Sequence, residues 1–141
     1  MAISQITMES QKQCIFCNLA SERIIAENEL CLAIRDGFPV SEGHTLIIPK
    51  RHVADYFDLT SDEIAAMQTM MKENKCQLDN TLHPDGYNVG VNVNAAAGQT
   101  VFHVHMHLIP RYTSDAQKIA WKPLEVSAEE LVAVRELLTK E

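Results

Sequence analysis

Histidine alternates with bulky apolar residues in the segment VFHVHMHLIP, residues 101–110. Successive side chains of a β-strand point to opposite faces of a sheet. The alternation therefore predicts a strand with His103, His105 and His107 on one face and apolar side chains, directed into a core, on the other. Neighbouring imidazoles would lie about 6.5–7 Å apart along the strand. Such a row is arranged to hold a ligand.

The hydrophobic pattern of the remaining chain predicts a sheet with two helices around this strand. Further strands are expected at residues 23–26, 30–35 and 87–94, and in the segment GHTLIIPKRH as far as Pro49. A capping box at residues 60–63 predicts a helix that ends near Thr81. A final helix is expected after its capping residue Ser127, with four apolar side chains on one face: Leu131, Val134, Leu137 and Leu138. The order β-β-β-α-β-β-α predicts an α+β fold: a mainly antiparallel five-stranded sheet, one long central helix and a C-terminal helix. We expect residues 14–141 to form one domain and residues 1–13 to be loose.

Charge and hydropathy exclude several classes of partner. Twelve Lys and Arg against nineteen Asp and Glu leave a net charge of −7, which disfavours general binding of nucleic acid or of anionic membranes. No apolar run approaches the roughly twenty residues of a membrane span, and the N-terminus lacks the layout of a signal peptide. We therefore expect a cytoplasmic protein with reduced cysteines. In that setting the Cys14-x-x-Cys17 pair indicates metal or redox chemistry, while Cys31 and Cys76 are expected to be buried thiols.

Three interpretations of the histidine row remain open from the residues alone. The imidazoles could be solvated on an outer sheet face. A His-x-His pair could bind a catalytic metal, because neutral imidazole is the commonest zinc ligand. One imidazole could instead attack phosphorus while its neighbours bind phosphate oxygens.

The segment His103–Ile109 resembles the signature His-φ-His-φ-His-φ-φ, where φ is apolar, of the histidine triad (HIT) superfamily. GHTLIIPKRH at 43–52 and AGQTVFHVHMHLIPRY at 97–112 are also similar to segments of that family at the right separation. The resemblance covers about residues 14–112, and it is nearest to bacterial HIT hydrolases of the Hint and Fhit branches. It implies the HIT-like fold and a nucleotide-binding enzyme.

The resemblance assigns catalytic roles to residues near the triad. His105, the middle histidine, is implied to be the nucleophile, with its other ring nitrogen donating to a backbone carbonyl. His107 would donate to an oxygen of the α-phosphate, and His44 would belong to the same histidine cluster. Gln99 and Thr100 would bind phosphate and leaving-group oxygens through backbone N–H groups and the threonine hydroxyl.

The resemblance also implies a nucleoside site. Asp36 would accept hydrogen bonds from both ribose hydroxyls, although an Asp before Gly37 could equally be a turn residue. Asn92 would contact the sugar or the phosphate. Three apolar side chains, those of Ile15, Phe16 and Leu19, would form part of the wall around the base. They could instead belong to the core. Because none of the three has a side-chain donor or acceptor, we expect weak discrimination between bases.

A second constellation consists of Cys14, Cys17, His52 and His103. It resembles the zinc site of some HIT proteins, and two thiolates with two imidazoles satisfy a closed tetrahedral, structural site. The alternatives are two reduced cysteines beside a surface histidine, or a redox pair. If zinc binds here, His103 is a ligand and is not a free acid.

These observations predict a HIT hydrolase that cleaves nucleoside phosphoramidates or dinucleoside polyphosphates at the α-phosphate through a covalent nucleotidyl-histidine intermediate. It would need no catalytic cofactor, and its structural Zn²⁺ would not take part in the chemistry. The family implies a homodimer. Two other hypotheses are a zinc-dependent hydrolase with the three triad histidines as ligands, and a non-catalytic nucleotide-binding partner protein.

Overall fold

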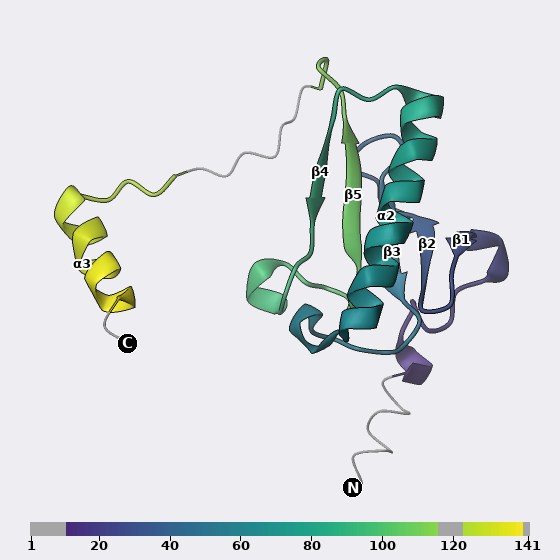
Figure 1. The fold of residues 1–141 in the computed structure, drawn as a ribbon, viewed down its shortest axis with the longest axis horizontal. Helices are drawn as coiled ribbons and strands as arrows, with labels where there is room; N and C mark the ends of the chain where they lie inside the picture. Colours follow the sequence, from purple (N-terminus) through teal and green to yellow (C-terminus); the bar gives the residue numbers. More distant parts are fainter. Residues whose placement is uncertain (1–10, 116–122, 140–141) are drawn as a thin grey trace, which may run out of the picture.

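Five antiparallel strands form one sheet in the computed structural model, which describes residues 11–115 and 123–139 (Figure 1). The strands are β1 (Ile24–Glu27), β2 (Cys31–Arg35), β3 (Thr45–Pro49), β4 (Gly86–Gly90) and β5 (Met106–Arg111). They lie in the spatial order β1-β2-β3-β5-β4. Every neighbouring pair is antiparallel, so the predicted α+β fold is confirmed.

The long helix α2 (Ser61–Leu82) covers one face of the sheet (Figure 1). It begins as predicted, because the Thr60 side chain accepts from the Glu63 backbone N–H and the Glu63 carboxylate accepts from the Thr60 N–H. It ends where His83 adopts the left-handed conformation at φ 49°. Three buried methionines of this helix, Met67, Met70 and Met71, belong to the core. They pack against residues of the sheet, namely Cys31, Ala33, Ile47 and Leu108. Cys76, which was predicted to be buried, is exposed on this helix.

The opposite face of the sheet is partly covered by the segment around Cys14 and Phe16, which packs on Leu32, Ile34, Leu46 and Ile48. On this face, residues that pair directly on neighbouring strands form a line across the sheet. Ile24 lies opposite Ile34, Ile34 opposite Leu46, and Leu46 opposite His107. We call these four residues the cross-strand row. Opposite partners in a sheet project to the same side, so the row forms a continuous floor from β1 to β5.

The histidine strand is shorter than predicted. β5 begins at Met106, so His107 lies in the strand whereas His103 and His105 lie in the loop before it. Pairing with β3 ends at Ile47 and Met106. Pro49, further along β3, has no N–H with which to extend the ladder, and the Val104 N–H donates to the Val53 carbonyl outside the sheet. The prediction of one flat row of three imidazoles is therefore wrong. β4 is also shorter than the predicted 87–94 and ends at Gly90.

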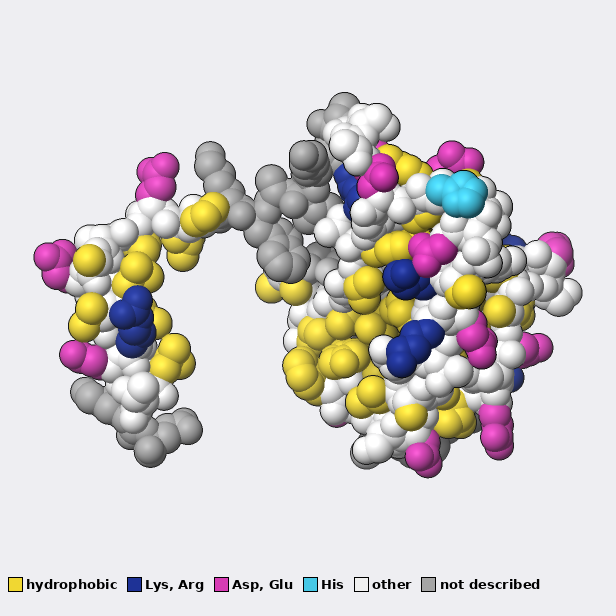
Figure 2. Space-filling model, turned by 45° about the horizontal axis from the view of Figure 1, so that its top comes forward, with side chains coloured by type: hydrophobic (Ala, Val, Ile, Leu, Met, Phe, Trp, Pro, Cys, Tyr) yellow, Lys and Arg dark blue, Asp and Glu magenta, His cyan; other side chains and the backbone are white. Residues whose placement is uncertain are grey.

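The C-terminal helix α3 (Ala128–Leu138) forms as predicted, with the Ser127 side chain accepting from the Glu130 N–H. None of its residues is buried. It stands apart from the sheet in Figure 1, and its apolar side chains are visible on the surface in Figure 2. Of the segment predicted to be loose, residues 1–10 lie outside the described residues and residues 11–13 are helical. No helix within 11–115 and 123–139 is long and apolar enough to span a membrane.

Candidate active site and candidate metal centre

A pocket of about 360 Å³ opens beside the cross-strand row. Its floor includes Ile34, Leu46 and His107 from that row. It brings together seven of the residues predicted to bind or act on a nucleotide, namely Ile15, Phe16, Asp36, Asn92, Thr100, His105 and His107. They come from the N-terminal segment, the end of β2, the loop after β4 and the start of β5. The pocket is therefore assembled from residues up to 92 positions apart, from Ile15 to His107.

His105 is held in one tautomer by the backbone. Its Nδ1 lies 2.9 Å from the His103 carbonyl oxygen, which can only accept, so Nδ1 bears the proton. Nε2 of the neutral ring is then the bare nitrogen. The residue is 8% exposed and its ring packs edge-on against Phe16, with ring centroids 5.1 Å apart. An imidazole fixed in this way can attack an electrophile through Nε2 without first losing a proton.

His44 and His107 are joined in a directed chain of hydrogen bonds. The Val40 backbone N–H donates to Nδ1 of His44 at 3.1 Å, so the proton of a neutral His44 lies on Nε2. This Nε2 is 2.9 Å from Nδ1 of His107 and donates to it. The proton of His107 consequently lies on its own Nε2, which leaves His107 with one N–H donor that is not used by His44.

Burial keeps both of these histidines neutral near pH 7. Burial lowers the pKa of His44, against the opposing effect of the nearby Asp36 carboxylate. Burial, reinforced by the neighbouring His105 and His44, lowers the pKa of His107 to about 4. Neutral rings are what the chain of hydrogen bonds requires, because each ring accepts at Nδ1 and donates at Nε2.

Acid should therefore weaken the fold through His107. The unfolded chain binds a proton on this ring at its ordinary pKa of 6.5, whereas the folded chain does so only at about 4. Between these values the unfolded state binds more protons, so the free energy of unfolding falls as the pH falls from 6.5 to 4. We expect a loss of about 1–2 kcal/mol from this group after allowance for its partial exposure. Urea unfolding of the wild type and of His107→Asn at pH 7.5 and 4.5 measures it. An equal loss in both proteins would exclude the assignment.

The two carboxylate oxygens of Asp36 have different partners. Oδ1 accepts from the Phe38 backbone N–H at 2.9 Å, which is the turn interaction considered from the sequence. Oδ2 lies 3.4 Å from Nε2 of His44. The carboxylate lines the pocket and is partly exposed, so Oδ2 can also accept from a ligand. The turn role and the predicted binding role are compatible.

In the loop before the triad, Gln99 does not lie where the predicted phosphate-binding role would require. This residue does not line the pocket: its backbone N–H donates to the Asn94 carbonyl, its side-chain oxygen accepts from the Asn94 N–H, and its amide donates to Ala54 and Val101. Because its donors are engaged by Asn94, Ala54 and Val101, Gln99 shapes the loop and is not available to phosphate. Thr100 and Asn92 do line the pocket, and Gly98 at φ 94° lets the chain turn between them.

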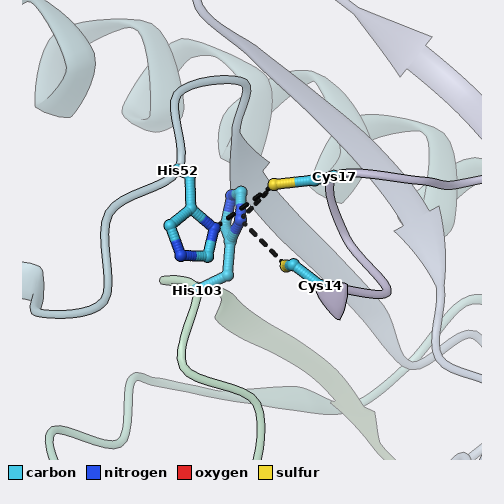
Figure 3. Close-up of side chains that lie close together, drawn as sticks. All are labelled: Cys14, Cys17, His52 and His103. Carbon is cyan, nitrogen blue, oxygen red and sulfur yellow. Dashed lines mark hydrogen bonds between the residues drawn. The ribbon is translucent and has the colours of Figure 1, made fainter. Parts of the chain in front are cut away.

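The structure brings the four residues of the second predicted constellation together (Figure 3). Sγ of Cys17 lies 3.2 Å from Nδ1 of His52 and 3.5 Å from Nδ1 of His103, and Sγ of Cys14 lies 3.4 Å from the latter. The four ligand atoms all lie within 4.8 Å of one another. They come from the N-terminal segment, the loop after β3 and the loop before β5, so one ion here would join three segments of the chain.

The donor set fits zinc. Nε2 of His103 lies 2.8 Å from the Pro49 carbonyl and must donate to it, which leaves Nδ1 bare toward the cysteines. Burial, together with the neighbouring Cys14, raises the pKa of Cys17 to about 11. Without a cation the Cys17 thiol therefore keeps its proton at neutral pH, whereas a bound Zn²⁺ would displace it.

Comparison with known proteins identifies the family, since residues 19–114 match the HIT domain. The chain belongs to the HIT family. A HIT-like protein of Mycoplasma pneumoniae is 37% identical over 136 residues, 94% of each chain. The adenosine 5'-monophosphoramidase hnt1 of Schizosaccharomyces pombe is 34% identical over 128 residues, 87% of this chain and 93% of that protein. The structure of a Zn-bound histidine triad family protein from Mycobacterium smegmatis is 33% identical with a TM-score of 0.70, covering 93% of this chain and 99% of that chain. The resemblance found in the sequence is thus confirmed.

The HIT pocket of this chain also contains residues that the sequence analysis did not select. Arg23, Gly37 and Phe38 also line it. The Phe38 side chain is 93% exposed. Neither an isolated arginine before a strand nor a phenylalanine in a turn has a sequence signal for binding. Leu19, in contrast, does not line the pocket and packs against the core, as the alternative interpretation allowed.

Proposed function

We propose that this HIT protein is a hydrolase that cleaves nucleoside phosphoramidates or dinucleoside polyphosphates at the α-phosphate, with His105 as nucleophile. The observation on which the proposal rests is the 2.9 Å hydrogen bond from Nδ1 of His105 to the His103 carbonyl. It makes Nε2 the bare nitrogen in a pocket that also contains the neutral His107 donor. Family membership, and relatives named as nucleotide enzymes, support the same class.

The reaction would proceed by two displacements. Nε2 of His105 forms a bond to the α-phosphorus while the bond from phosphorus to the leaving nitrogen or oxygen breaks, and the leaving group departs with the electron pair and takes up a proton. Water then bonds to phosphorus and releases a proton to solvent, the P–Nε2 bond breaks with its electron pair returning to His105, and a nucleoside monophosphate is released. The positive charge that develops on His105 is stabilised by its Nδ1–H donation to the His103 carbonyl.

Two groups would stabilise the phosphoryl oxygens during both displacements. The Nε2–H of His107 is oriented by the chain from Val40 through His44, so its position requires no reorganisation during reaction. The Thr100 hydroxyl lines the same pocket and can donate to a phosphate or leaving-group oxygen. Asn92, on the other side of Gly98, would contact the sugar or the phosphate.

Asp36 would bind the ribose hydroxyls through Oδ2. We expect 2',3'-dideoxy-AMP to bind the wild-type protein at least tenfold more weakly than AMP, because the carboxylate loses its hydrogen-bond partners. Asp36→Asn retains an oxygen for the Phe38 N–H and should reduce the difference to about twofold. Calorimetric titration of both nucleotides into both proteins tests this. Equal affinities of the wild type for the two nucleotides would leave Asp36 with the turn role alone.

The Cys14, Cys17, His52 and His103 cluster would hold one structural zinc. When bound, the ion would fix the N-terminal segment to the sheet without taking part in the chemistry, since four protein ligands leave no open position. The Zn-bound relative from Mycobacterium smegmatis supports a metal in this family.

The alternative of a zinc hydrolase with three triad ligands is less favoured by the geometry. Nδ1 of His103 faces the cysteines, Nδ1 of His105 is bonded to a carbonyl, and Nδ1 of His107 is bonded to His44. Among the described residues, the ring nitrogens of these three histidines do not form a group close enough to hold one metal ion. A homodimer in the cytoplasm stays a prediction from the resemblance and the composition.

A substrate panel separates the remaining hypotheses. Adenosine phosphoramidate, diadenosine polyphosphates and adenylylated amines would be assayed with wild-type and His105→Asn protein, with and without chelator, below the melting temperature. The proposal requires turnover that needs His105 and survives chelation. Turnover that chelation abolishes in a folded protein would indicate a zinc hydrolase. Tight nucleotide binding without turnover would indicate a partner protein.

A further inference from the structure

The residues on the floor of the pocket indicate how a bound nucleotide would be oriented. His107 at one end belongs to the catalytic group, and the next two residues of the cross-strand row, Leu46 and Ile34, are apolar. These residues lie on β5, β3 and β2, with neighbouring strands about 4.8 Å apart. The row therefore extends about 10 Å from His107 to Ile34, comparable to a nucleoside monophosphate measured from phosphorus to the far edge of the base.

Arg23 lies at the far end of this floor. It directly precedes Ile24, the last residue of the row on β1. Its Nη2 donates to the Arg35 carbonyl at the end of β2, at 3.0 Å, and lies 3.8 Å from the position that a Cβ on Gly37 would occupy. The guanidinium thus lies beside the residue that follows Asp36, and within the part of the chain that the structure describes one of its five N–H donors is hydrogen-bonded.

The remaining donors of Arg23 are not engaged by an acid. No salt bridge to Arg23 occurs among residues 11–115 and 123–139. Within the same ranges it is the one lysine or arginine lining the pocket. A guanidinium that lines an apolar pocket and has no acidic partner among the described residues is suited to planar, bidentate acceptors.

We propose that Arg23 determines base specificity by reading the edge of the base, and that the site prefers 6-oxopurines (guanine and hypoxanthine) over adenine. The inference rests on the proposed function, with the phosphate at His105 and His107 and the ribose at Asp36. The base then lies over Leu46 and Ile34, beside Phe16 and the exposed Phe38 ring, with its outer edge toward Arg23.

The preference follows from donor and acceptor patterns. Guanine and hypoxanthine present two adjacent acceptors, O6 and N7, which a guanidinium binds with two parallel N–H donors. Adenine presents N7 beside an amino group, so one donor of Arg23 would face another donor. This reverses the weak base discrimination expected from the sequence, which considered apolar residues alone.

Equilibrium binding of nucleoside monophosphates to the full-length wild-type protein tests the proposal. GMP and IMP should bind about tenfold more tightly than AMP, a typical value for one bidentate contact, and guanosine without phosphate should bind much more weakly than GMP. AMP that binds as tightly as GMP would overturn the base-reading role. If GMP bound no better than guanosine, the proposed nucleotidyl function itself would fail.

Two variants separate base reading from a structural role of Arg23. Arg23→Gln offers the amide pattern that pairs with adenine N6 and N7, so the ratio of GMP to AMP affinity should invert or reach one. Arg23→Lys keeps the charge without the planar fork and should reduce the ratio to about twofold. Lys72→Gln, an exposed cation on α2, is the matched control and should leave the ratio unchanged. If Arg23→Gln weakened all nucleotides equally, the proposal would be overturned.

Discussion

Replacing His105 with asparagine is expected to lower kcat at least a thousandfold while AMP affinity changes less than threefold. The loss is large because the substitution removes the atom that forms the bond to phosphorus. Affinity is retained because the proposed ribose and phosphate contacts of Asp36, Thr100 and His107 do not depend on the His105 ring. Steady-state kinetics on the best substrate of the panel, together with calorimetry, measure both quantities.

A histidine outside the pocket provides the matched control for this substitution. His83 is exposed at the C-terminal end of α2 and adopts φ 49°, a conformation that asparagine tolerates well. His83→Asn should keep kcat within twofold of the wild type. Activity of His105→Asn within tenfold of the wild type would reject His105 as the nucleophile.

Removal of zinc is expected to produce the largest change in stability. Protein purified without added metal should contain about one equivalent of zinc per chain, and stripping it should lower the melting temperature by at least about 10 °C, since structural zinc contributes several kcal/mol to folding. Cys17→Ser should reproduce the loss. Cys76→Ser, a change at the exposed cysteine of α2, is the control and should have little effect. An unchanged melting temperature of metal-free protein would count against the site.

Metal removal should also affect the proposed nucleophile, because His103 belongs to the candidate metal site and contacts His105. The ring of His103 faces the cysteines through Nδ1 while its backbone carbonyl accepts from His105. Phe16, between the two cysteines in sequence, packs against both histidine rings. Metal-free protein should therefore retain the reaction with a reduced kcat/KM, in contrast to the complete loss expected of a catalytic metal.

Local sequence signals predicted the elements of this fold reliably. The capping box at Thr60 places the start of α2 correctly because both of its hydrogen bonds join residues within one helical turn. The positions of the strands along the chain followed from their hydrophobic pattern, whereas their spatial order in the sheet was not predicted. The members of the cysteine–histidine cluster and of the pocket followed from motif spacing and family resemblance. The start of β5 was missed because it depends on Pro49, which is 57 residues away from Met106 in the chain and ends the pairing.

Features that depend on long-range contacts could not be predicted. The tautomers of His103 and His107 are set by Pro49 and His44, which lie 54 and 63 positions away. Gln99 was predicted to bind phosphate through its backbone N–H, which donates instead to the Asn94 carbonyl, in a loop that the Gln99 side chain joins to Ala54, 45 positions away. Arg23 has no motif of its own, and its placement at the pocket arises from the pairing of β1 with β2 and from the Arg35 carbonyl.

The stereochemical course at phosphorus is the most direct test of a nucleotidyl-histidine intermediate. A substrate with a chiral, isotopically labelled α-phosphorothioate would be hydrolysed by the wild-type protein in labelled water, and the configuration of the product determined by ³¹P NMR. Two in-line displacements, first by Nε2 of His105 and then by water, predict net retention of configuration. Net inversion would mean a single direct attack by water and would contradict the covalent mechanism.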